Sequence, residues 1–210
     1  MPARHPLPVT RLRAEDRRRA ADVLGRAFTE DPLWAAIMPD DATRPAKLTR
    51  MFSDLTKLVA GARGLPLTAD TLSVALWLPP GRDLGLRAFL RSGIATVRTT
   101  LALPADDRRR MLGALRQIGR KRGRHVPDPH WYLLALGTDP DHQGAGLGST
   151  LVREGTRQAD VEGARTYLET ETEANVDFYS HLGFEVVEEM TIEDLDVPIW
   201  LMRREPSRST

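Results

Sequence analysis

The sequence predicts an α/β fold with a mixed β-sheet, and three observations support this fold class. Strand-like and helix-like segments alternate through the second half of the chain, at lengths typical of a sheet flanked by helices. A glycine-rich stretch joins one of these strands to the next helix, which favours a parallel strand pair connected through that helix. The length of 210 residues suits a single domain, which we place at residues 8–204, before a polar tail at residues 205–210.

Composition narrows the class of protein. With 41% hydrophobic and 28% charged residues the chain is typical of globular proteins, and no apolar run approaches the roughly 18 residues of a membrane span. The first residues are too polar for a signal peptide, so we expect a cytoplasmic protein with no membrane contact. The chain has no cysteine, which excludes disulfides, thiolate zinc sites and cysteine nucleophiles.

Elements of the first half follow from apolar spacing and from the positions of proline and glycine. Residues 11–28 predict a short strand leading into a helix, whose end is marked by Asp31 and Pro32. A second helix is expected at residues 44–62. Residues 65–78 have strand character with a polar interruption, so we expect an antiparallel pair that stops before Pro79. Two helices, at residues 84–103 and 105–121, complete this half.

The second half has a more regular pattern, which begins after Pro129. We expect a strand at residues 131–137, a loop at 138–143, a helix at 146–162 and a strand at 165–170. A helix at residues 174–182 then leads to strands at 185–191 and 199–203. The two strands on either side of the glycine-rich helix form the predicted parallel pair.

The glycine-rich loop is the first candidate site. Its glycines would let backbone N–H groups converge on an anion at the start of a helix, and a pyrophosphate is the natural ligand. The loop lacks the lysine of a nucleotide-hydrolysing P-loop, and its spacing differs from the dinucleotide fingerprint. Taken alone, it could equally be a tight strand-to-helix turn. Its residues are Gln143, Gly144, Ala145, Gly146, Leu147 and Gly148.

Three motifs in order carry a resemblance to a known family. Residues 134–148 resemble the acetyl-coenzyme A motif of the GNAT N-acetyltransferases, with its Gln/Arg-x-x-Gly-x-Gly/Ala signature, and residues 167–170 and 175–184 match the motif that follows. More narrowly, residues 28–33, 76–81 and 129–133 look like the puromycin N-acetyltransferase-like branch. The resemblance spans most of the chain and implies the GNAT fold, whose parallel strand pair splays apart at the cofactor site.

The resemblance also implies a donor site for acetyl-CoA as cosubstrate, with no metal. In GNAT enzymes the pantetheine arm runs along the fourth strand, and backbone N–H groups of the glycine loop hold the pyrophosphate with help from the helix dipole. His142, in a polar turn beside the loop, is expected to have a structural or phosphate-side role. Carried over by residue, the further cofactor positions are Leu136, Gly137, Thr138, Ser149 and Asn175.

Acetyl transfer requires a neutral amine to attack the thioester and a proton for the departing thiolate. Tyr179 occupies the family's general-acid position, and a phenol pKa of about 10 roughly matches an alkyl thiolate. Alternatively, Tyr179 packs its own helix. Glu169 is our first choice for the base, because Glu169, Glu171 and Tyr167 share one face of a strand. Both glutamates could instead be solvated or paired with arginines.

The acceptor site is the least specified part. In GNAT folds the N-terminal helices and the strands opposite the cofactor form it, which points to Phe28, Asp31, Trp34 and Trp77, with Glu171 beside them. Asp31 and Trp34 would suit a cationic amine, although Asp31 before a proline is also an ordinary helix stop. Each of these residues could equally belong to the core.

An arginine-rich segment at residues 108–124 contrasts with an acidic one at residues 160–196, within a net charge of +1. The basic segment lacks interleaved aromatics and has apolar residues on one helical face, so we expect a solvated helix rather than a nucleic-acid surface. One or two of its arginines could meet the 3′-phosphate of coenzyme A. The helices between residues 82 and 124 could cap the acceptor pocket.

These features together predict an acetyl-CoA-dependent N-acetyltransferase that acetylates a primary amine of a small molecule by direct attack. Two alternatives stay open: an enzyme that acetylates protein or peptide amines, and a non-catalytic domain that senses acetyl-CoA. The expected partners are acetyl-CoA and the amine, and the expected assembly is a monomer or a homodimer.

Overall fold

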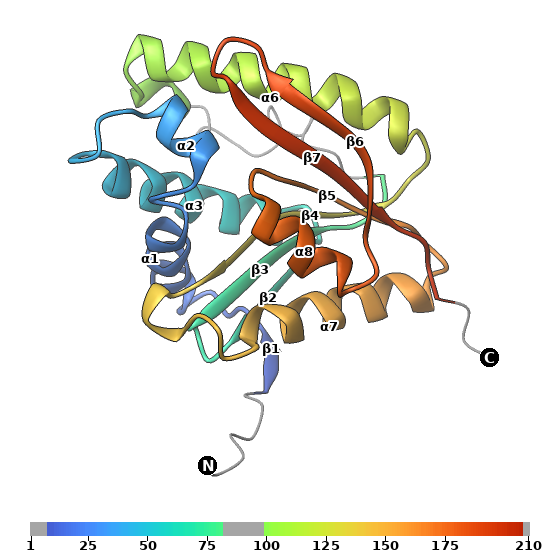
Figure 1. Ribbon diagram of the computed structural model, residues 1–210. Helices are drawn as coiled ribbons and strands as arrows, with labels where there is room; N and C mark the ends of the chain where they lie inside the picture. Colours follow the sequence, from blue (N-terminus) through green and yellow to red (C-terminus); the bar gives the residue numbers. More distant parts are fainter. Residues whose placement is uncertain (1–7, 82–98, 208–210) are drawn as a thin grey trace.

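The computed structural model describes residues 8–81 and 99–207, and its centre is a seven-stranded sheet. The strands are β1 (Val9–Arg11), β2 (Leu65–Ala69), β3 (Ser73–Leu78), β4 (Trp131–Thr138), β5 (Thr166–Thr170), β6 (Glu185–Ile192) and β7 (Val197–Arg204). Their spatial order is β1-β2-β3-β4-β5-β7-β6 (Figure 1). Within this sheet β4 and β5 are parallel and the other neighbours are antiparallel, so the sheet is mixed, as predicted.

The parallel strands pair only at their first residues. Trp131 lies opposite Thr166 and Tyr132 lies opposite Tyr167, and the register is not continued beyond these positions. The strands therefore separate toward their carboxyl ends and open the middle of the sheet. Helix α7 (Leu147–Val161) connects them, which confirms the predicted parallel pair and its splay.

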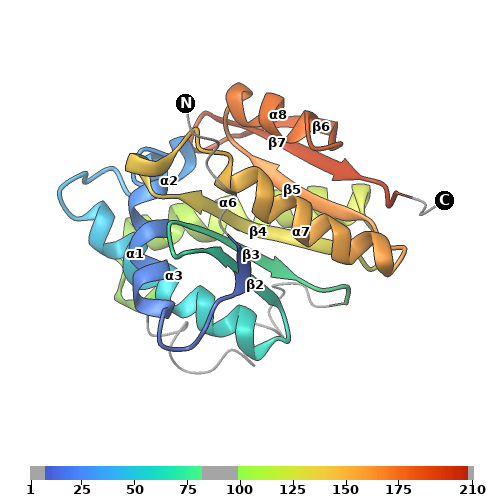
Figure 2. The same cartoon turned by 90° about the horizontal axis from the view of Figure 1, so that it is seen from below.

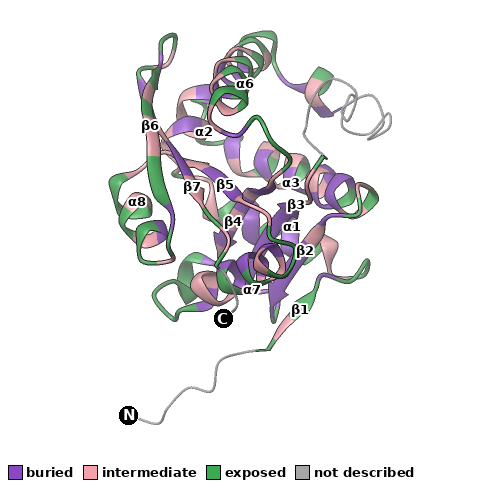
Figure 3. Ribbon diagram, turned by 90° about the vertical axis from the view of Figure 1, so that its right-hand side faces the viewer, coloured by how far each residue is buried: buried purple, intermediate pink, exposed green. Residues whose placement is uncertain are grey.

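Helices cover both faces of the sheet. One face carries α1 (Arg17–Ala27), α3 (Arg44–Gly61) and α6 (Ala105–His125), and the other carries α7 and α8 (Glu173–Ser180) (Figures 1 and 2). All residues of β3 are buried, because Leu76 faces the first layer of helices and Trp77 faces the second. Figure 3 places the buried residues along the strands and the exposed ones on the outer faces of the helices.

One short helix is absent from the sequence prediction. Asp31 and Pro32 follow the end of α1, as expected, but they also begin α2 (Pro32–Ile37). The Asp31 carboxylate accepts the Trp34 backbone N–H at 3.0 Å, and Pro32 occupies the first helical position. An N-cap aspartate followed by proline is a helix-start signal as well as a helix stop, and the sequence prediction used only the second meaning.

The remaining predicted elements are present, with small differences at their ends. The helix predicted at residues 105–121 continues to His125, and the Val126 backbone N–H still donates to the Arg122 carbonyl at its end. Most of the helix predicted at residues 84–103 lies outside the described residues, although residues 99–102 are helical. Within the described ranges, no helix combines the length and the apolar character needed to cross a membrane.

Candidate active site

The glycine-rich loop joins β4 to α7 after a short 3₁₀ turn, η1 (Pro140–His142). Gly144 and Gly146 have φ angles of +74° and +78°, a left-handed conformation that strongly favours glycine. Gly146 directly precedes the first turn of α7, whose N–H groups have no partner within the helix. The loop therefore ends in a helix start of the kind that binds anions.

A salt bridge from α1 holds the polar turn before this loop. Arg26 donates to Asp139 at 2.7 Å and to Asp141 at 2.9 Å. Asp139 also accepts the Asp141 backbone N–H at 3.0 Å, and His142 Nδ1 lies 3.6 Å from Asp139 Oδ1. His142 thus belongs to the polar network of the turn, which supports the structural role expected for it.

A groove of about 620 Å³ runs along the end of β4 and the glycine loop. Gly137 lies in this groove, and a Cβ there would approach Leu24 Cδ2 to 2.9 Å and Ala27 Cβ to 3.0 Å, so its missing side chain lets α1 pack close to β4. Ala145 alone among the cofactor candidates does not line the groove. Those that do are Leu136, Gly137, Thr138, Gln143, Gly144, Gly146, Leu147, Gly148, Ser149 and Asn175.

The arginine-rich segment lies away from this groove. In the described part of the chain no arginine lines the groove, and α6 instead covers a second cavity, where it contributes Arg116 and Arg122. The idea that arginines of this segment meet the coenzyme A 3′-phosphate is therefore not supported. The expectation that helices before residue 124 cap an acceptor pocket fits the position of α6.

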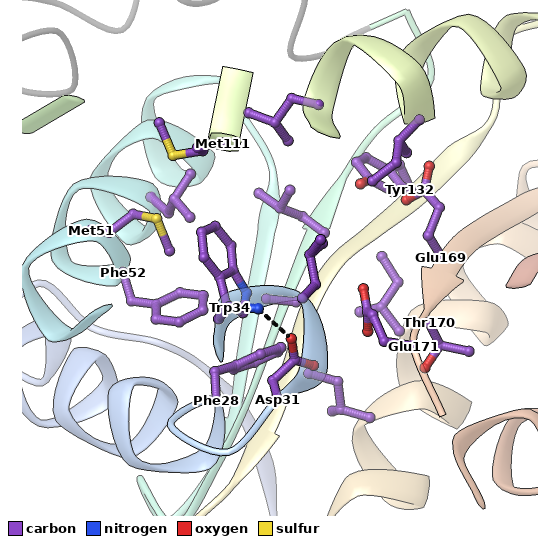
Figure 4. A pocket seen from close by; sticks show the side chains of 18 of the residues that line it. Phe28, Asp31, Trp34, Met51, Phe52, Met111, Tyr132, Glu169, Thr170 and Glu171 are labelled. Atoms are coloured by element: carbon purple, nitrogen blue, oxygen red, sulfur yellow. Dashed lines mark hydrogen bonds between the residues drawn. The ribbon is translucent and has the colours of Figure 1, made fainter. Parts of the chain in front are cut away.

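The second cavity, of about 720 Å³, lies between α2, α3, α6 and the splayed strands (Figure 4). Trp34, Met51 and Phe52 form an apolar wall on one side, and Tyr132 and Glu171 lie on the opposite side (Figure 4). Apolar residues of α6 complete the wall that faces away from the groove. This composition suits a ligand with a large apolar body and few polar groups.

The groove and the cavity meet at a shared set of residues, one of which is Tyr179 of α8. Its ring packs edge-on against Phe178 and Phe184, with centroid distances of 5.0 and 5.8 Å. Burial, and then the charge of Glu171, raise the pKa of Tyr179 above its usual value, so the phenol stays protonated near neutral pH. The residues that line both spaces are Phe28, Asp31, Leu136, Asn175 and Tyr179.

Two carboxyl groups lie together beside this junction. Asp31, before α2, and Glu171, after β5, both line the cavity, and their side chains lie close to each other (Figure 4). Burial raises the pKa of both groups, and the charge of Asp31 raises the pKa of Glu171 further. The Trp34 N–H partly opposes this shift at Asp31. Both shifts favour a proton on this pair of carboxyl groups, because two neighbouring negative charges repel each other where water is scarce.

Glu169 is engaged by a buried arginine. Arg122 Nε donates to Glu169 Oε1 at 2.9 Å, and Arg122 Nη2 donates to the Tyr132 hydroxyl at 3.0 Å. Burial lowers the pKa of Arg122, but the Glu169 carboxylate more than offsets this, so the pKa lies above its usual value. This ion pair is the alternative that the sequence left open, and it argues against Glu169 as the base.

Trp77 contacts neither space, so its assignment to the acceptor site is wrong. Its side chain is fully buried and faces α7, where a Cβ on Gly155 would lie only 2.2 Å from Trp77 Cε2. Strand alternation explains the error, since Leu76 and Trp77 point to opposite faces of β3. The other acceptor candidates, Phe28, Asp31, Trp34 and Glu171, all line the cavity.

Sequence reasoning missed Arg122 and Tyr132, which form the floor of the cavity with Glu169. A signal for Arg122 was present, because it follows Ile118 by four residues on the apolar face of α6. Tyr132 carried no such signal. Its position in β4 is that of an ordinary core residue, and the Arg122 guanidinium lies 3.9 Å over its ring only because α6 crosses the sheet there.

Comparison with known proteins identifies related chains. A family model described as the acetyltransferase (GNAT) family matches residues 91–184, which include β4, the glycine loop, α7, β5 and α8. An uncharacterised N-acetyltransferase of Schizosaccharomyces pombe is 28% identical over 207 residues, covering 93% of this chain and 82% of that protein.

Solved structures share the fold over almost the whole chain. A Corynebacterium glutamicum protein described as histone acetyltransferase HPA2 and related acetyltransferase is 25% identical, with a TM-score of 0.67 over 98% of this chain and 99% of its own. Arylalkylamine N-acetyltransferase 2 of Aedes aegypti is 16% identical, with a TM-score of 0.65 over 97% of this chain and 100% of its own. The puromycin-like branch stays a prediction. With its mixed sheet, splayed parallel pair and glycine loop, the chain has the fold of the GNAT acetyltransferases, matches their family model at residues 91–184, and is an acetyl-CoA-dependent N-acetyltransferase.

Proposed function

We propose that this enzyme acetylates a primary amine of a small molecule by direct attack on acetyl-CoA, with Tyr179 as the general acid. The observation that carries this proposal is the meeting of the groove and the cavity at Phe28, Asp31, Leu136, Asn175 and Tyr179. A thioester held in the groove and an amine held in the cavity would come together there. Such positioning converts a bimolecular encounter into a step within one complex.

The donor would lie along the groove. Beyond Tyr132, β4 no longer pairs with β5, so its backbone groups on that side are available to amides of the pantetheine arm. Leu136, Gly137 and Thr138 are the residues at that position, beside Asn175. The pyrophosphate would bind the backbone N–H groups of the loop and the first turn of α7.

In the proposed reaction the neutral amine nitrogen attacks the thioester carbonyl carbon. A C–N bond forms, the C–S bond breaks, and the Tyr179 hydroxyl donates its proton to the departing thiolate. Tyr179 is suited to this role because its raised pKa keeps the proton in place until the thiolate forms. The proton lost by the amine would pass to the Asp31–Glu171 pair, which lines the cavity, rather than to the ion-paired Glu169.

The helices around the cavity favour a small acceptor. Proteins of this fold include an arylalkylamine N-acetyltransferase of Aedes aegypti and a ribosomal-protein-S18-alanine N-acetyltransferase of Escherichia coli, so the fold alone does not select between small molecules and peptides. Here α2, α3 and α6 all contribute walls, and the lining is largely apolar. A peptide enzyme instead needs an open groove for the chain beyond its amine.

A coenzyme A-release assay with a panel of acceptors tests this proposal. The panel contains puromycin, polyamines, arylalkylamines, amino acids and peptides, and we expect thiol release with at least one small amine. Gly146→Glu should abolish acetyl-CoA binding by placing a charged side chain at the helix start, whereas Gly119→Glu, at an open position of α6, should not.

Two results would contradict the proposal. Acetylation of peptides without any small amine would establish the peptide enzyme in its place. Tight acetyl-CoA binding without thiol release for any amine, together with no effect of Tyr179→Phe, would instead indicate a sensor domain.

A further inference from the structure

We propose that the acceptor cavity selects amines with a single cationic centre and an apolar body, because Arg122 neutralises the second acidic position along β5. This inference rests on the proposed function, since it concerns the acceptor of the same reaction. It predicts that a monoamine is acetylated in preference to a diamine of the same chain length.

The acidic side chains that line the cavity differ in whether a basic side chain already neutralises them, and this difference supports the selection. They are Asp31, Asp54, Glu169 and Glu171. Asp54 lies 3.3 Å from Lys57 Nζ and also accepts the Thr99 hydroxyl, so its charge is already compensated. Glu169 is compensated by Arg122. Among the described lining residues, only the Asp31–Glu171 pair has no basic partner.

This pair offers one negative charge to a ligand. Its two carboxyl groups lie close together on a largely apolar lining, where two adjacent negative charges would repel, so a proton held between them leaves one anionic site rather than two. The site lies at the end of the cavity that meets the groove, because Asp31 lines both. One ammonium group can be received there, next to the proposed thioester position.

The second acidic position is closed to a cation. Glu169, in β5, lies two residues before Glu171, which directly follows the strand, and an extended chain places two such residues roughly 7 Å apart. A second ammonium of a bound diamine would reach toward it. There it would meet the Arg122 guanidinium, which is fixed by Glu169 and by the Tyr132 hydroxyl and ring. Two cations in such an apolar enclosure repel strongly, since water screens them poorly.

The remaining walls favour hydrocarbon over charge. Trp34, Met51, Phe52 and Met111 line the cavity with apolar surface (Figure 4). Arg116, an exposed residue of α6, also lines the cavity and adds a second positive charge to its lining. A ligand with an ammonium at one end and an apolar body is therefore complementary to the whole cavity.

Pentylamine and cadaverine form a matched pair for the test, because both have five carbons and cadaverine differs only by an ammonium in place of one hydrogen of the terminal methyl group. We expect kcat/KM with acetyl-CoA to be at least about tenfold higher for pentylamine, mainly through KM. Equal values, or a higher value for cadaverine, would overturn the inference. The same comparison with phenethylamine tests whether an aromatic body is accepted as well.

Three variants test whether Arg122 is the cause. Arg122→Met leaves the Glu169 carboxylate free and should move the preference toward cadaverine by about tenfold. Arg122→Lys keeps the charge and should retain the preference for pentylamine. The double variant Arg122→Met with Glu169→Gln removes both charges and should retain it too. An unchanged ratio in folded Arg122→Met, or a preference for cadaverine in the double variant, would contradict the inference.

Folding and failure of catalysis are controlled separately. Circular dichroism and acetyl-CoA binding establish that each variant is folded. If Arg122→Met does not fold, the inference is tested by the ratio of kcat/KM for pentylamine to that for cadaverine, measured in the wild type and in the double variant. Absence of thiol release with every amine counts against the proposed function alone. Calorimetric binding of the two amines then decides the inference, with tighter binding of pentylamine expected and equal binding contradicting it.

Discussion

Arg26 of α1 binds Asp139 with its Nη1 atom 2.7 Å from Oδ2, so the first helix of the chain holds the turn that precedes the glycine loop. Ala27, the last residue of α1, and Phe28, which follows it, line the groove itself. The position of the loop relative to the groove therefore depends on a contact between segments that are far apart in the sequence.

Replacing Arg26 by methionine should weaken acetyl-CoA binding. Removal of the guanidinium frees the turn, so we expect the KM for acetyl-CoA to rise about two- to fivefold, with little change in kcat. Steady-state kinetics at low salt measures this. Arg19→Met is the matched control, because Arg19 is exposed on the same helix and has no ion pair among the described residues. An equal rise in both variants would show that the salt bridge is not responsible.

Tyr179→Phe should lower kcat by about 100-fold or more, since a general acid typically contributes that much. The ring is kept, so its packing on Phe178 and Phe184 and the acetyl-CoA affinity should change little. Tyr132→Phe is a control that removes another hydroxyl of the cavity, and it should act mainly on KM. A loss of kcat as large in Tyr132→Phe would contradict the special role of Tyr179.

The pH dependence of kcat offers an independent check on Tyr179. Its pKa is raised by burial and by Glu171, so the phenol should remain a proton donor beyond the ordinary phenol pKa of about 10. The wild-type kcat should therefore show no loss from Tyr179 ionisation as pH approaches that value. A decline there that Tyr179→Phe abolishes would mean that the pKa is not raised.

Glu171→Gln should stabilise the protein above the acid range. Because the pKa of Glu171 is raised in the folded state, folding favours the protonated group. Its contribution is fully present below the unfolded pKa of about 4.3 and is lost as pH rises through the folded pKa. Urea unfolding should thus give a variant that is more stable than the wild type near neutral pH, with the difference shrinking toward acid.

The matched control for this experiment is Glu173→Gln, in the exposed first turn of α8. It makes the same chemical exchange without removing a buried carboxyl group, so its effect should vary little with pH. A wild-type stability that falls no faster with pH than that of Glu171→Gln would contradict the raised pKa. The same variant should lose activity if the pair receives the amine.

Gly155→Ala should destabilise the fold through Trp77. The added methyl group would lie 2.2 Å from Trp77 Cε2, and forcing the buried ring aside should cost about 1–3 kcal/mol of unfolding free energy. Gly119→Ala is the control, because nothing lies within 4 Å of a Cβ at that helical position. It should raise the unfolding free energy by up to about 1 kcal/mol, and equal losses in both variants would contradict the packing explanation.

The sequence by itself determined the features that depend on neighbouring residues. Apolar periodicity located the strands and most helices, since each pattern repeats within a few residues. The glycine loop was recognisable because Gly144 and Gly146 need a left-handed backbone, a local requirement. The order of motifs indicated an acetyltransferase, and the match of residues 91–184 to the acetyltransferase family model supports this prediction.

Only the tertiary structure decided how charges are paired and which faces meet. Glu169 looked like a free base, but Arg122, 47 residues earlier, neutralises it where α6 crosses the sheet. Trp77 looked like an acceptor contact, but its face of β3 is covered by α7. Asp31 and Glu171 line one cavity and raise each other's need for a proton because the start of α2 and the end of β5 lie close together. Desolvation and charge at a side chain depend on neighbours in space, which local sequence patterns do not specify.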